Sequence, residues 1–396
     1  MNTQLINISF PDIFKRYSSK YNIYRELYEK GQLGLEIRGI NAGLLDRIQR
    51  MIFERNEICY KILHVSGADA GDLLVTGSIG AFMEIARDTI SFGNEDLGHK
   101  ITSLIRNYLA YDNSSYKVCG RIVPAEECLV MGILNVTPDS FSDGGRYFQH
   151  ENAIIHAREM INDGADIIDI GGESTRPGAE SVSEAGEIER IIPVIEKILE
   201  FSPDTVISVD TTKKNVAREA LKRGAKIIND ISGLTFEPEI AHVAKEFNAG
   251  LVIMHIKGTP RDMQAHPFYE DVTSEVYDFL AERVSFAKKA GVKNIIVDPG
   301  IGFGKRVQDN YELIKRLDEF KGLGFPILIG VSRKAFLGKT MGGLEPFERD
   351  TATVIAEALS IRNGARIIRT HNVKNAVQAK KILKCLSNPE DIKLNV

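Results

Sequence analysis

Polar side chains follow apolar segments of this chain at the points where those segments end. The first such segment, 129–134, is followed by Asn135 and then by a polar stretch that contains Pro138, Gly144 and Gly145. A short apolar run bounded by turn residues is typical of a strand buried on both faces, and proline and glycine exclude a continued strand or helix. The sequence therefore predicts a buried strand that delivers an amide side chain into a long polar loop.

Similar polar groups follow the other apolar segments further along the chain. In order, they are the 171–178 stretch, Asp210, Asn229 with Asp230, Met254 with His255, the 298–305 stretch, Ser332 to Lys334, and Arg369 to Asn372. Any one of these is most simply a helix cap or a turn residue. Their recurrence at successive strand ends indicates a shared site instead, because parallel strands bring their carboxyl ends to one edge of a fold.

The residue types at these strand ends indicate which ligand such a site would hold. Acceptors and amide donors that suit the edge of a flat heterocycle come from Asp210, Asn229 and Asp298. Cations that suit a phosphate or diphosphate come from Lys334, Arg369 and His371, with Thr175 and Arg176 in a Gly/Ser/Pro loop. We therefore expect a polar ring at one end of the site and a polyanion at the other. No Ser/His/Asp nucleophile set stands out.

The glycine-rich stretch 300–305 matches neither of two common nucleotide-binding motifs. Pro299 and Arg306 stand where a P-loop needs Gly and Ser or Thr, and Lys305 stands where a dinucleotide fingerprint needs its last Gly. We therefore reject an ATPase and an NAD-dependent enzyme. The glycines are expected to let the backbone approach a ligand, with Phe303 folded over a ring.

The elements that would position these groups alternate between strand and helix from residue 129 onward. Strands are expected to start near residues 129, 165, 205, 226, 251, 294, 326 and 366. Helices are expected over 151–163, 184–200, 213–223, 238–247, 272–290, 309–320, 349–363 and 374–386, with Gly164, Gly224, Gly250, Gly291 and Gly364 as helix stops. These units over 129–386 come close to the ~250 residues of a (β/α)8 TIM barrel. A doubly wound open sheet is the alternative.

The first part of the chain has a different pattern and carries no evident catalytic constellation. Residues 1–115 are expected to form a smaller mixed α/β domain of unknown role, and 116–396 the barrel domain with the catalytic site. In the first domain, helices are expected over 21–30, 43–54, 81–90 and 96–108, and strands over 58–65 and 73–75. We expect 112–115 to be a linker and 117–123 a strand in a hairpin that closes the bottom of the barrel.

Composition and charge narrow the class of protein. The net charge of −4 argues against a nucleic-acid binder dominated by phosphate contacts. The start of the chain does not resemble a signal peptide, and no apolar run approaches the ~20 residues of a membrane span. The four cysteines form no C-x-x-C pair, which is typical of reduced cytosolic thiols. We therefore expect a cytoplasmic protein that binds neither nucleic acid nor membrane.

Taken together, the motifs resemble those of the dihydropteroate synthase family. The stretches that carry the resemblance are 135–145, 172–178, 208–211, 228–230, 298–305, 332–334 and 369–371, in the family's order. The likeness covers roughly 117–386 and leaves 1–115 outside. One departure is Asn372, where the family usually has Asp; the amide keeps an acceptor and loses the charge.

The resemblance implies that the chain joins 4-aminobenzoate to 6-hydroxymethyl-7,8-dihydropterin diphosphate, a step of folate biosynthesis that sulfonamides target. Carried over by position, the pterin would be bound by Asp210, Asn229, Asp298 and Lys334, with Met254 and Phe303 beside it. The diphosphate would be held by Arg369 and His371 near Thr175, with Mg²⁺ at Asn135. The aminobenzoate pocket would be shaped by Phe141, Arg176, Pro177 and Ser332. Asp210, Asp298, Lys334, Arg369 and His371 would be the catalytic groups.

Two other functions remain open at this point. A methyltetrahydrofolate-dependent methyltransferase of the pterin-binding family would share the pterin carboxylates, but it has no diphosphate to bind, so Arg369 and His371 argue against it. A barrel kept only as a scaffold for the first domain is disfavoured by the full set of polar groups. The resemblance alone implies a homodimer.

Overall fold

The computed structural model of the chain describes residues 1–21, 33–53, 59–64, 70–137, 146–174, 181–387 and 389–391. The chain divides into two compact units. The first comprises Met1–Ser114 together with Asp318–Gly324, and the second comprises Ser115–Leu317 and Phe325–Val396. The helix expected over 21–30 lies outside the described residues apart from Tyr21, which ends a helix. None of the described helices is long and apolar enough to cross a membrane.

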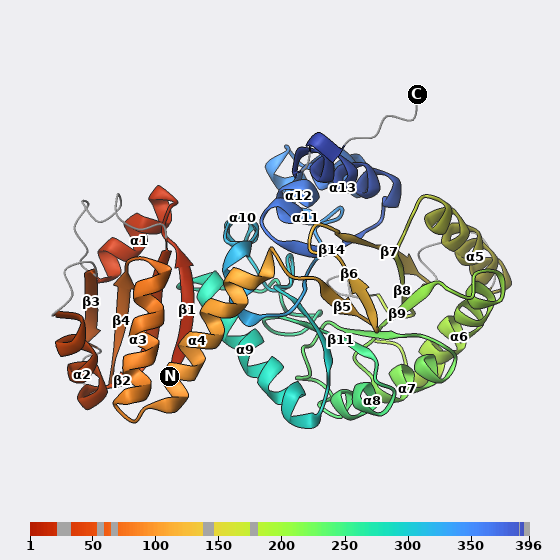
Figure 1. The fold of residues 1–396 in the computed structure, drawn as a ribbon. Coiled ribbons are helices and arrows are strands. Elements are labelled where there is room, and N and C mark those ends of the chain that lie inside the picture. The colour runs from red at the N-terminus through yellow and green to blue at the C-terminus, as the bar shows by residue number, and fades with distance from the viewer. Residues whose placement is uncertain are drawn as a thin grey trace. The chain divides into compact units, whose positions relative to one another are not determined.

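The second unit is a closed barrel of eight parallel strands, so the expected TIM barrel is confirmed (Figure 1). Its strands are β7 (Leu129–Asn135), β8 (Ile167–Gly171), β9 (Val206–Asp210), β10 (Ile227–Asp230), β11 (Gly250–Met254), β12 (Asn294–Asp298), β13 (Ile327–Ile329) and β14 (Ala365–Thr370). The barrel closes where β14 pairs with β7, with Ile367 opposite Leu129. Each expected strand start lies within two residues of the observed one.

Helices cover the outside of the barrel and follow its strands. They are α5 (Arg146–Asn162), α6 (Glu184–Phe201), α7 (Lys214–Lys222), α8 (Ile240–Glu246), α9 (Val272–Ala290), α10 (Val307–Lys315), α11 (Ala335–Thr340), α12 (Asp350–Arg362) and α13 (Val373–Ser387). The short α11 was not expected from the sequence. The helix expected over 309–320 is wrong in its second half: α10 ends at Lys315, and a 3-10 helix, η3, follows over Leu317–Leu323.

Four of the five expected glycine helix stops are confirmed. Gly164, Gly224, Gly291 and Gly364 all have positive φ, between 93° and 110°. Gly250 is different, because it begins β11, and Asn248 adopts the left-handed conformation before it, with φ 50°. The reason for glycine at 250 is space, since a Cβ there would lie 3.2 Å from both Cys119 Sγ and Ile227 Cγ1.

The expected β-hairpin closes the amino-terminal end of the barrel, but the single strand expected over 117–123 is wrong, because this stretch contains both strands of the hairpin and its turn. Strands β5 (Tyr116–Val118) and β6 (Arg121–Val123) pair antiparallel across a two-residue turn, at which Cys119 and Gly120 both have positive φ, as a primed turn requires. Val118 and Val123 pack into one apolar cluster with the barrel strands, including Met131. This end is filled by apolar side chains, which leaves the carboxyl ends of the strands for polar groups.

The first unit is a four-stranded antiparallel sheet with helices, in the order β1-β2-β4-β3. Its strands are β1 (Asn2–Asn7), β2 (Leu33–Asn41), β3 (Cys59–His64) and β4 (Ala70–Thr76), and its helices are α1 (Pro11–Tyr21), α2 (Ala42–Phe53), α3 (Ile79–Ser91) and α4 (Glu95–Tyr111). The sequence indicated β3, β4 and the last three helices but not β1, β2 or α1. On β2, the buried Glu36 accepts hydrogen bonds from Lys20, Tyr21 and Arg38.

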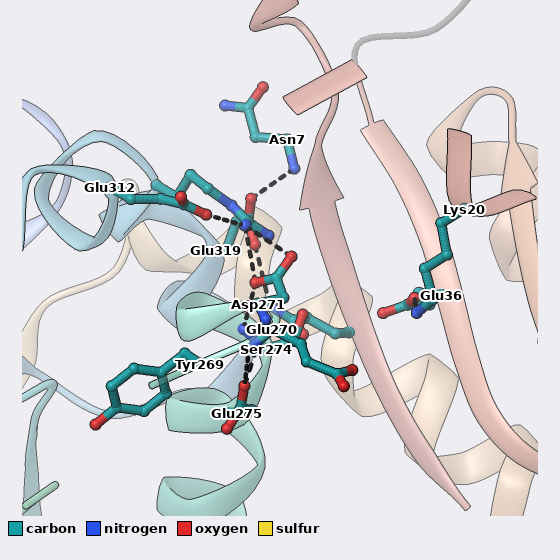
Figure 2. A network of polar contacts seen from close by, with 12 residues as sticks. Asn7, Lys20, Glu36, Tyr269, Glu270, Asp271, Ser274, Glu275, Glu312 and Glu319 are labelled. Carbon is teal, nitrogen blue, oxygen red and sulfur yellow. Dashed lines mark hydrogen bonds and ion pairs between the residues drawn. The ribbon is translucent and has the colours of Figure 1, made fainter. Parts of the chain in front are cut away.

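A segment from within the barrel's own sequence completes the first unit. Figure 2 shows Glu319 beside Asn7 at the end of β1. The buried Glu319 carboxylate accepts a hydrogen bond from Asn7 N at 2.9 Å and another from Gln4 Nε2 at 3.0 Å. Asn7 Nδ2 also donates to Asp318 Oδ2 at 2.7 Å, and Lys321 lies 2.7 Å from Asp112. These bonds explain why residues 318–320 do not prolong α10 as the sequence suggested.

In the second unit, Asp271 and Glu312, also drawn in Figure 2, hold the buried guanidinium of Arg316 at the end of α10. The Nη1 atom of Arg316 lies 2.9 Å from Asp271 Oδ1 and 2.8 Å from Glu312 Oε1. Asp271 also caps α9, because its Oδ1 accepts from Ser274 N. Helix α10, which precedes the segment Asp318–Gly324, is therefore held in the second unit by the buried ion pairs of Arg316.

Replacing Glu319 by Gln should loosen β1. Both carboxylate oxygens accept hydrogen bonds, so the amide nitrogen would face one of the two donors, at a cost of about 1–3 kcal/mol. We expect faster amide hydrogen exchange over 2–7. The matched control is Glu196→Gln, which removes an exposed ion pair with Arg223 and should cost under about 0.5 kcal/mol. Unchanged amide exchange in Glu319→Gln would show that the segment Asp318–Gly324 does not stabilise β1.

Candidate functional site

Polar side chains from four strands of the barrel, β8, β9, β10 and β14, form a connected cluster near its carboxyl end. Arg369, on β14, donates from Nε to Asp169 Oδ2 and from Nη2 to Asp210 Oδ2, both at 2.6 Å. Asn229, on β10, donates from Nδ2 to the same Asp169 Oδ2 at 3.0 Å. Asp169, Asp210 and Asn229 are all buried. The structure therefore joins three residues expected at the site, Arg369, Asp210 and Asn229, through a fourth.

That fourth residue, Asp169, was not selected from the sequence. It lies in the middle of β8 within the apolar run 167–170, and it is fully buried. A carboxylate within such a run is costly unless it is paired, and this rule is the signal that could have identified it. Its partner Arg369 lies 200 residues away in sequence, so the pairing itself could not be deduced.

Burial and neighbouring charges shift the pKa values of this cluster. Burial raises the pKa of Asp210 to about 7, although the nearby Arg369 opposes the shift. Burial works against the charged form of Arg369, but Asp169 and Asp210 raise its pKa. Arg369 therefore remains a cation, while Asp210 can change its charge near neutral pH.

A second pair of ionisable groups lies at the end of β12 and just before α11. Burial raises the pKa of Asp298, and Lys334 opposes this shift. Burial also lowers the pKa of Lys334 to about 7, with Asp298 opposing it. Asp298 Oδ1 accepts from Gly300 N at 2.7 Å, and Lys334 Nζ lies 4.3 Å from the centre of the Phe303 ring. The expected ring-binding residues thus include a carboxyl group and an amine, and burial disfavours the charged form of both.

The glycine-rich stretch after β12 folds against the chain itself. A Cβ at Gly300 would lie 1.8 Å from His255 O, and one at Gly302 would lie 2.7 Å from Lys334 Cδ. Both residues have positive φ. The glycines therefore have a reason in local packing, beyond the ligand approach that the sequence suggested.

The side chain of Lys305 makes hydrogen bonds that stabilise this glycine-rich stretch. Its buried Nζ lies 2.9 Å from His255 Nδ1, 2.8 Å from Gly300 O and 3.0 Å from Phe303 O. Burial lowers the pKa of Lys305 well below its usual value, and burial likewise lowers that of His255. These contacts give Lys305 and His255 a structural role beside Asp298.

His371 lies just past the end of β14 and is tied to the end of the neighbouring strand. Its backbone N donates to Ser332 Oγ at 3.1 Å, and its ring Nδ1 lies 3.0 Å from the same oxygen. The next residue, Asn372, donates to Asp350 at 2.9 Å, and its Oδ1 accepts from Asn375 N in the first turn of α13. Asn372 therefore acts as a helix cap here, which the sequence did not indicate.

The other expected site residues differ in how far the structure describes them. Met254 is buried in an apolar cluster against which Phe303 packs. Asn135 ends β7 and is half-buried. The expected residues Phe141, Thr175, Arg176 and Pro177 lie outside the described residues.

The loop after β8 has a described anchor. Glu173 Oε1 accepts from Val182 N at 3.0 Å across the loop. Lys213 pairs with both Glu173 and the buried Glu187, the latter at 2.6 Å. The two ends of the stretch that carries Thr175, at Glu173 and Val182, are therefore held together by a hydrogen bond, and Lys213 fixes Glu173 in place.

Comparison with known proteins places this geometry in a family. The model of the family described as "Pterin binding enzyme" matches residues 131–371. Dihydropteroate synthase of Bacillus subtilis is 49% identical over 265 residues, which cover 66% of this chain and 90% of that protein. The Escherichia coli K12 enzyme is 44% identical over 266 residues, covering 67% and 93%.

Solved structures agree with the sequence relatives. The Yersinia pestis dihydropteroate synthase in complex with a sulfonamide drug has a TM-score of 0.65 and 38% identity, over 69% of this chain and 99% of that one. The Xanthomonas albilineans enzyme in complex with 7,8-dihydropteroate has a TM-score of 0.62 and 36% identity, over 69% and 99%.

This chain belongs to the dihydropteroate synthase family of pterin-binding enzymes. Its activity is that of a transferase of this family, and the resemblance seen in the sequence motifs is confirmed. The matched region begins at residue 131, so the sheet and helices α1 to α4 of the first unit lie outside it, whereas Asp318–Gly324 lies within it.

The family resemblance implies a magnesium ion, and the side chains at the barrel mouth can be tested for it. Among the described residues there is no group of three His, Cys, Asp or Glu that could hold a metal. Mg²⁺ often takes only one or two protein ligands and completes its shell with substrate phosphates and water. The half-buried amide of Asn135 fits that pattern, since it supplies one oxygen and no competing charge.

The raised pKa of Asp210 predicts a pH-dependent stability. A carboxyl group whose pKa rises on folding, here from about 3.9 to about 7, destabilises the fold progressively as the pH rises between the two values. The free energy of unfolding of Asp210→Asn, relative to that of the parent, should therefore increase as the pH rises from about 4.5 to 6.5. Urea unfolding midpoints measure this difference. The control is Asp96→Asn. The hydrogen bond from Lys100 lowers the pKa of Asp96, so any pH-dependent change in the stability of this variant should fall at lower pH. A difference that is flat over this range would contradict the burial of an ionising Asp210.

Proposed function

We propose that this site joins 4-aminobenzoate to 6-hydroxymethyl-7,8-dihydropterin diphosphate and releases pyrophosphate, which makes 7,8-dihydropteroate for folate biosynthesis. The observation that carries the proposal is the cluster at the barrel mouth. Acceptors from Asp210, Asn229 and Asp298 lie next to a retained cation, Arg369. A donor-rich ring and an attached polyanion are the two halves of that substrate.

The ring end of the site consists of groups that reach only the edge of a flat ligand. Asp210, Asn229 and Asp298 would accept hydrogen bonds from the pterin ring, and Lys334 would donate one. Met254 and Phe303 belong to an apolar cluster that offers a wall for the ring face. Because the carboxylates are buried, each charge-assisted bond to the ring would be strong.

The diphosphate end depends on Arg369 and His371. Negative charge develops on the leaving diphosphate as its bond to the CH₂ carbon breaks, and fixed cations near it stabilise the transition state. We propose that Thr175 contributes a hydroxyl group nearby. Asn135 would hold Mg²⁺, which supplies charge stabilisation to the leaving group when bound.

The attacking group needs positioning more than activation. The amine of 4-aminobenzoate is a neutral nucleophile, so holding it in line with the CH₂ carbon can supply much of the rate. The pterin can stabilise positive charge that develops at that carbon, and a nearby carboxylate such as Asp298 or Asp210 would assist it. This chemistry does not require the paired nucleophile and base that the sequence lacks.

The second substrate would bind between two loops. We propose that Phe141, Arg176 and Pro177, together with Ser332, shape the aminobenzoate pocket. Sulfonamides, one of which is bound in the Yersinia pestis relative, would compete there. The methyltransferase alternative is less favoured, because the cation pair Arg369 and His371 has no counterpart in a substrate without diphosphate.

Replacing His371 by Ala should weaken the diphosphate substrate selectively. His371 bonds to Ser332 and lies outside the Asp169–Asp210 cluster, so its loss should spare binding of 6-hydroxymethylpterin. Arg369→Ala should weaken both ligands, because Asp169 and Asp210 lose a shared partner. We expect losses of about 1.5–3 kcal/mol, as for hydrogen bonds to charged groups, measured by calorimetric titration.

The activity itself is tested by pyrophosphate release. Release should require both substrates and should fall when a chelator removes Mg²⁺. Release without 4-aminobenzoate, or equal losses for both ligands in His371→Ala, would contradict the assignment.

We further propose that the enzyme is a cytoplasmic homodimer. Helices α12 and α13 lie side by side (Figure 1) and together expose four aliphatic side chains. These are Ile355, Leu359, Ile382 and Leu386, which are 49% to 69% exposed. Exposed aliphatic side chains on two neighbouring helices are typical of an interface.

Placing a charge in this patch should separate the dimer. Leu359→Glu should sediment as a monomer in analytical ultracentrifugation, because a buried unpaired carboxylate is costly at an apolar interface. The control is Leu109→Glu, an equally exposed leucine in the first unit, which should leave the sedimentation unchanged. A parent that is already monomeric would contradict the proposal.

A further inference from the structure

Asp169 occupies a deeper level of the barrel than the groups expected to bind the ring. In the β8–β9 register, Asp169 lies opposite Ser208, whereas Asp210 lies opposite Gly171. Asn229 lies opposite Asp210 in the next pair. Asp169 is therefore two residues further from the carboxyl end of its strand pair than Asp210. It is fully buried, so it lies beneath the level of the ring-binding groups.

The hydrogen bonds of Asp169 all converge on one oxygen. Its Oδ2 accepts from Arg369 Nε at 2.6 Å and from Asn229 Nδ2 at 3.0 Å. Its Oδ1 is buried and has no hydrogen-bond partner among the residues that the structure describes. A buried carboxylate is costly unless its partners compensate it. The donors that offset that cost are thus two residues of the proposed substrate site.

For Asn229, this contact decides which side of the amide faces the ring. Its Nδ2 donates to Asp169 Oδ2 at 3.0 Å. The amide therefore turns its NH₂ group to Asp169, and its Oδ1 is left for the ligand. With Asp210 and Asp298, the site then presents acceptors to a ring edge that carries N–H donors. A flipped amide would place a donor against those donors.

For Arg369, the contact fixes the guanidinium independently of Asp210. Asp169 holds Nε and Asp210 holds Nη2. If Asp210 turns to the ring when substrate binds, Asp169 still holds the guanidinium in place. Arg369 then keeps the orientation from which it meets the diphosphate, because the bond to Nε fixes the plane of the group.

We infer that Asp169 is a positioning residue that touches no substrate and orients both the amide that binds the ring and the guanidinium that binds the diphosphate. This inference rests on the proposed function of the same site. On this inference, the buried carboxylate of Asp169 aligns the residues that bind the two halves of the same substrate.

Two replacements of Asp169 separate its charge from its acceptor atom. Asp169→Asn keeps an oxygen that can accept from Asn229 and Arg369, and it loses the charge. Asp169→Leu has a similar size and leaves both donors unpartnered. In calorimetric titrations, Asp169→Leu should bind 6-hydroxymethylpterin about tenfold more weakly and the diphosphate substrate more weakly still, which corresponds to the loss of one to two hydrogen bonds. Asp169→Asn should lie between Asp169→Leu and the parent.

The kinetic signature distinguishes positioning from general loss of structure. At saturating pterin diphosphate, the KM for 4-aminobenzoate should stay within about twofold of the parent in both variants, while kcat/KM for the pterin substrate falls. The control is Glu319→Gln. Glu319 is also a buried carboxylate, but it lies in the first unit, where its oxygens accept from Gln4 and from Asn7 N. It should lower the melting temperature and leave both pterin affinities unchanged.

The outcomes are separable. If both Asp169 variants bind both pterins as the parent does, or lose affinity for 4-aminobenzoate equally, then Asp169 is only a structural residue and the inference is wrong. If the parent itself binds neither pterin, the proposed function fails first. Should Asp169→Leu not fold, the Asn variant decides, because it preserves the size and the acceptor.

Discussion

The guanidinium of Arg369, which two buried carboxylates hold, is the group on which the site depends. It lies between Asp169 and Asp210, and it links strands β8, β9 and β14 around the barrel. Taking these charges out of water is costly, so each needs the others. Removing Arg369 would leave two buried carboxyl groups without the cation that joins them. Burial raises the pKa of Asp210 to about 7, so the charge that faces Arg369 can change near neutral pH.

The rest of the barrel makes this cluster possible by closing the opposite end. The β5–β6 hairpin places Val118 and Val123 against the amino-terminal ends of the strands, where the side chains are apolar. Polar groups are then concentrated at the carboxyl ends, in the low-dielectric space that shifts their pKa values. The glycine-rich stretch after β12 adds to this enclosure, because Gly300 lets the backbone pass against His255 O.

Much of the second unit could be predicted from the sequence, because its signals are local. Apolar runs, glycine stops and strand-end polar groups gave the barrel and most of the cluster, including Asp210 and Asn229. Asp169 was missed, since its role depends on a partner 200 residues away. Gly250 was misjudged for a similar reason: its neighbour Cys119 is distant in the chain. In the first unit, β1 was missed because its hydrogen-bonding partners come from elsewhere in the chain.

The segment that completes the first unit also constrains how this unit can form. Gln4 and Glu319 are 315 residues apart in sequence, and contacts of such separation form late because loop closure opposes them. The sheet of the first unit can assemble from Met1–Ser114, but the partners of Asn7 and Gln4 come only with Asp318–Gly324. A chain cut at Asp112 would leave the buried Glu319 without its two donors. The first unit therefore needs a segment that follows most of the barrel in sequence, even though the chemistry proposed for the barrel uses none of its residues.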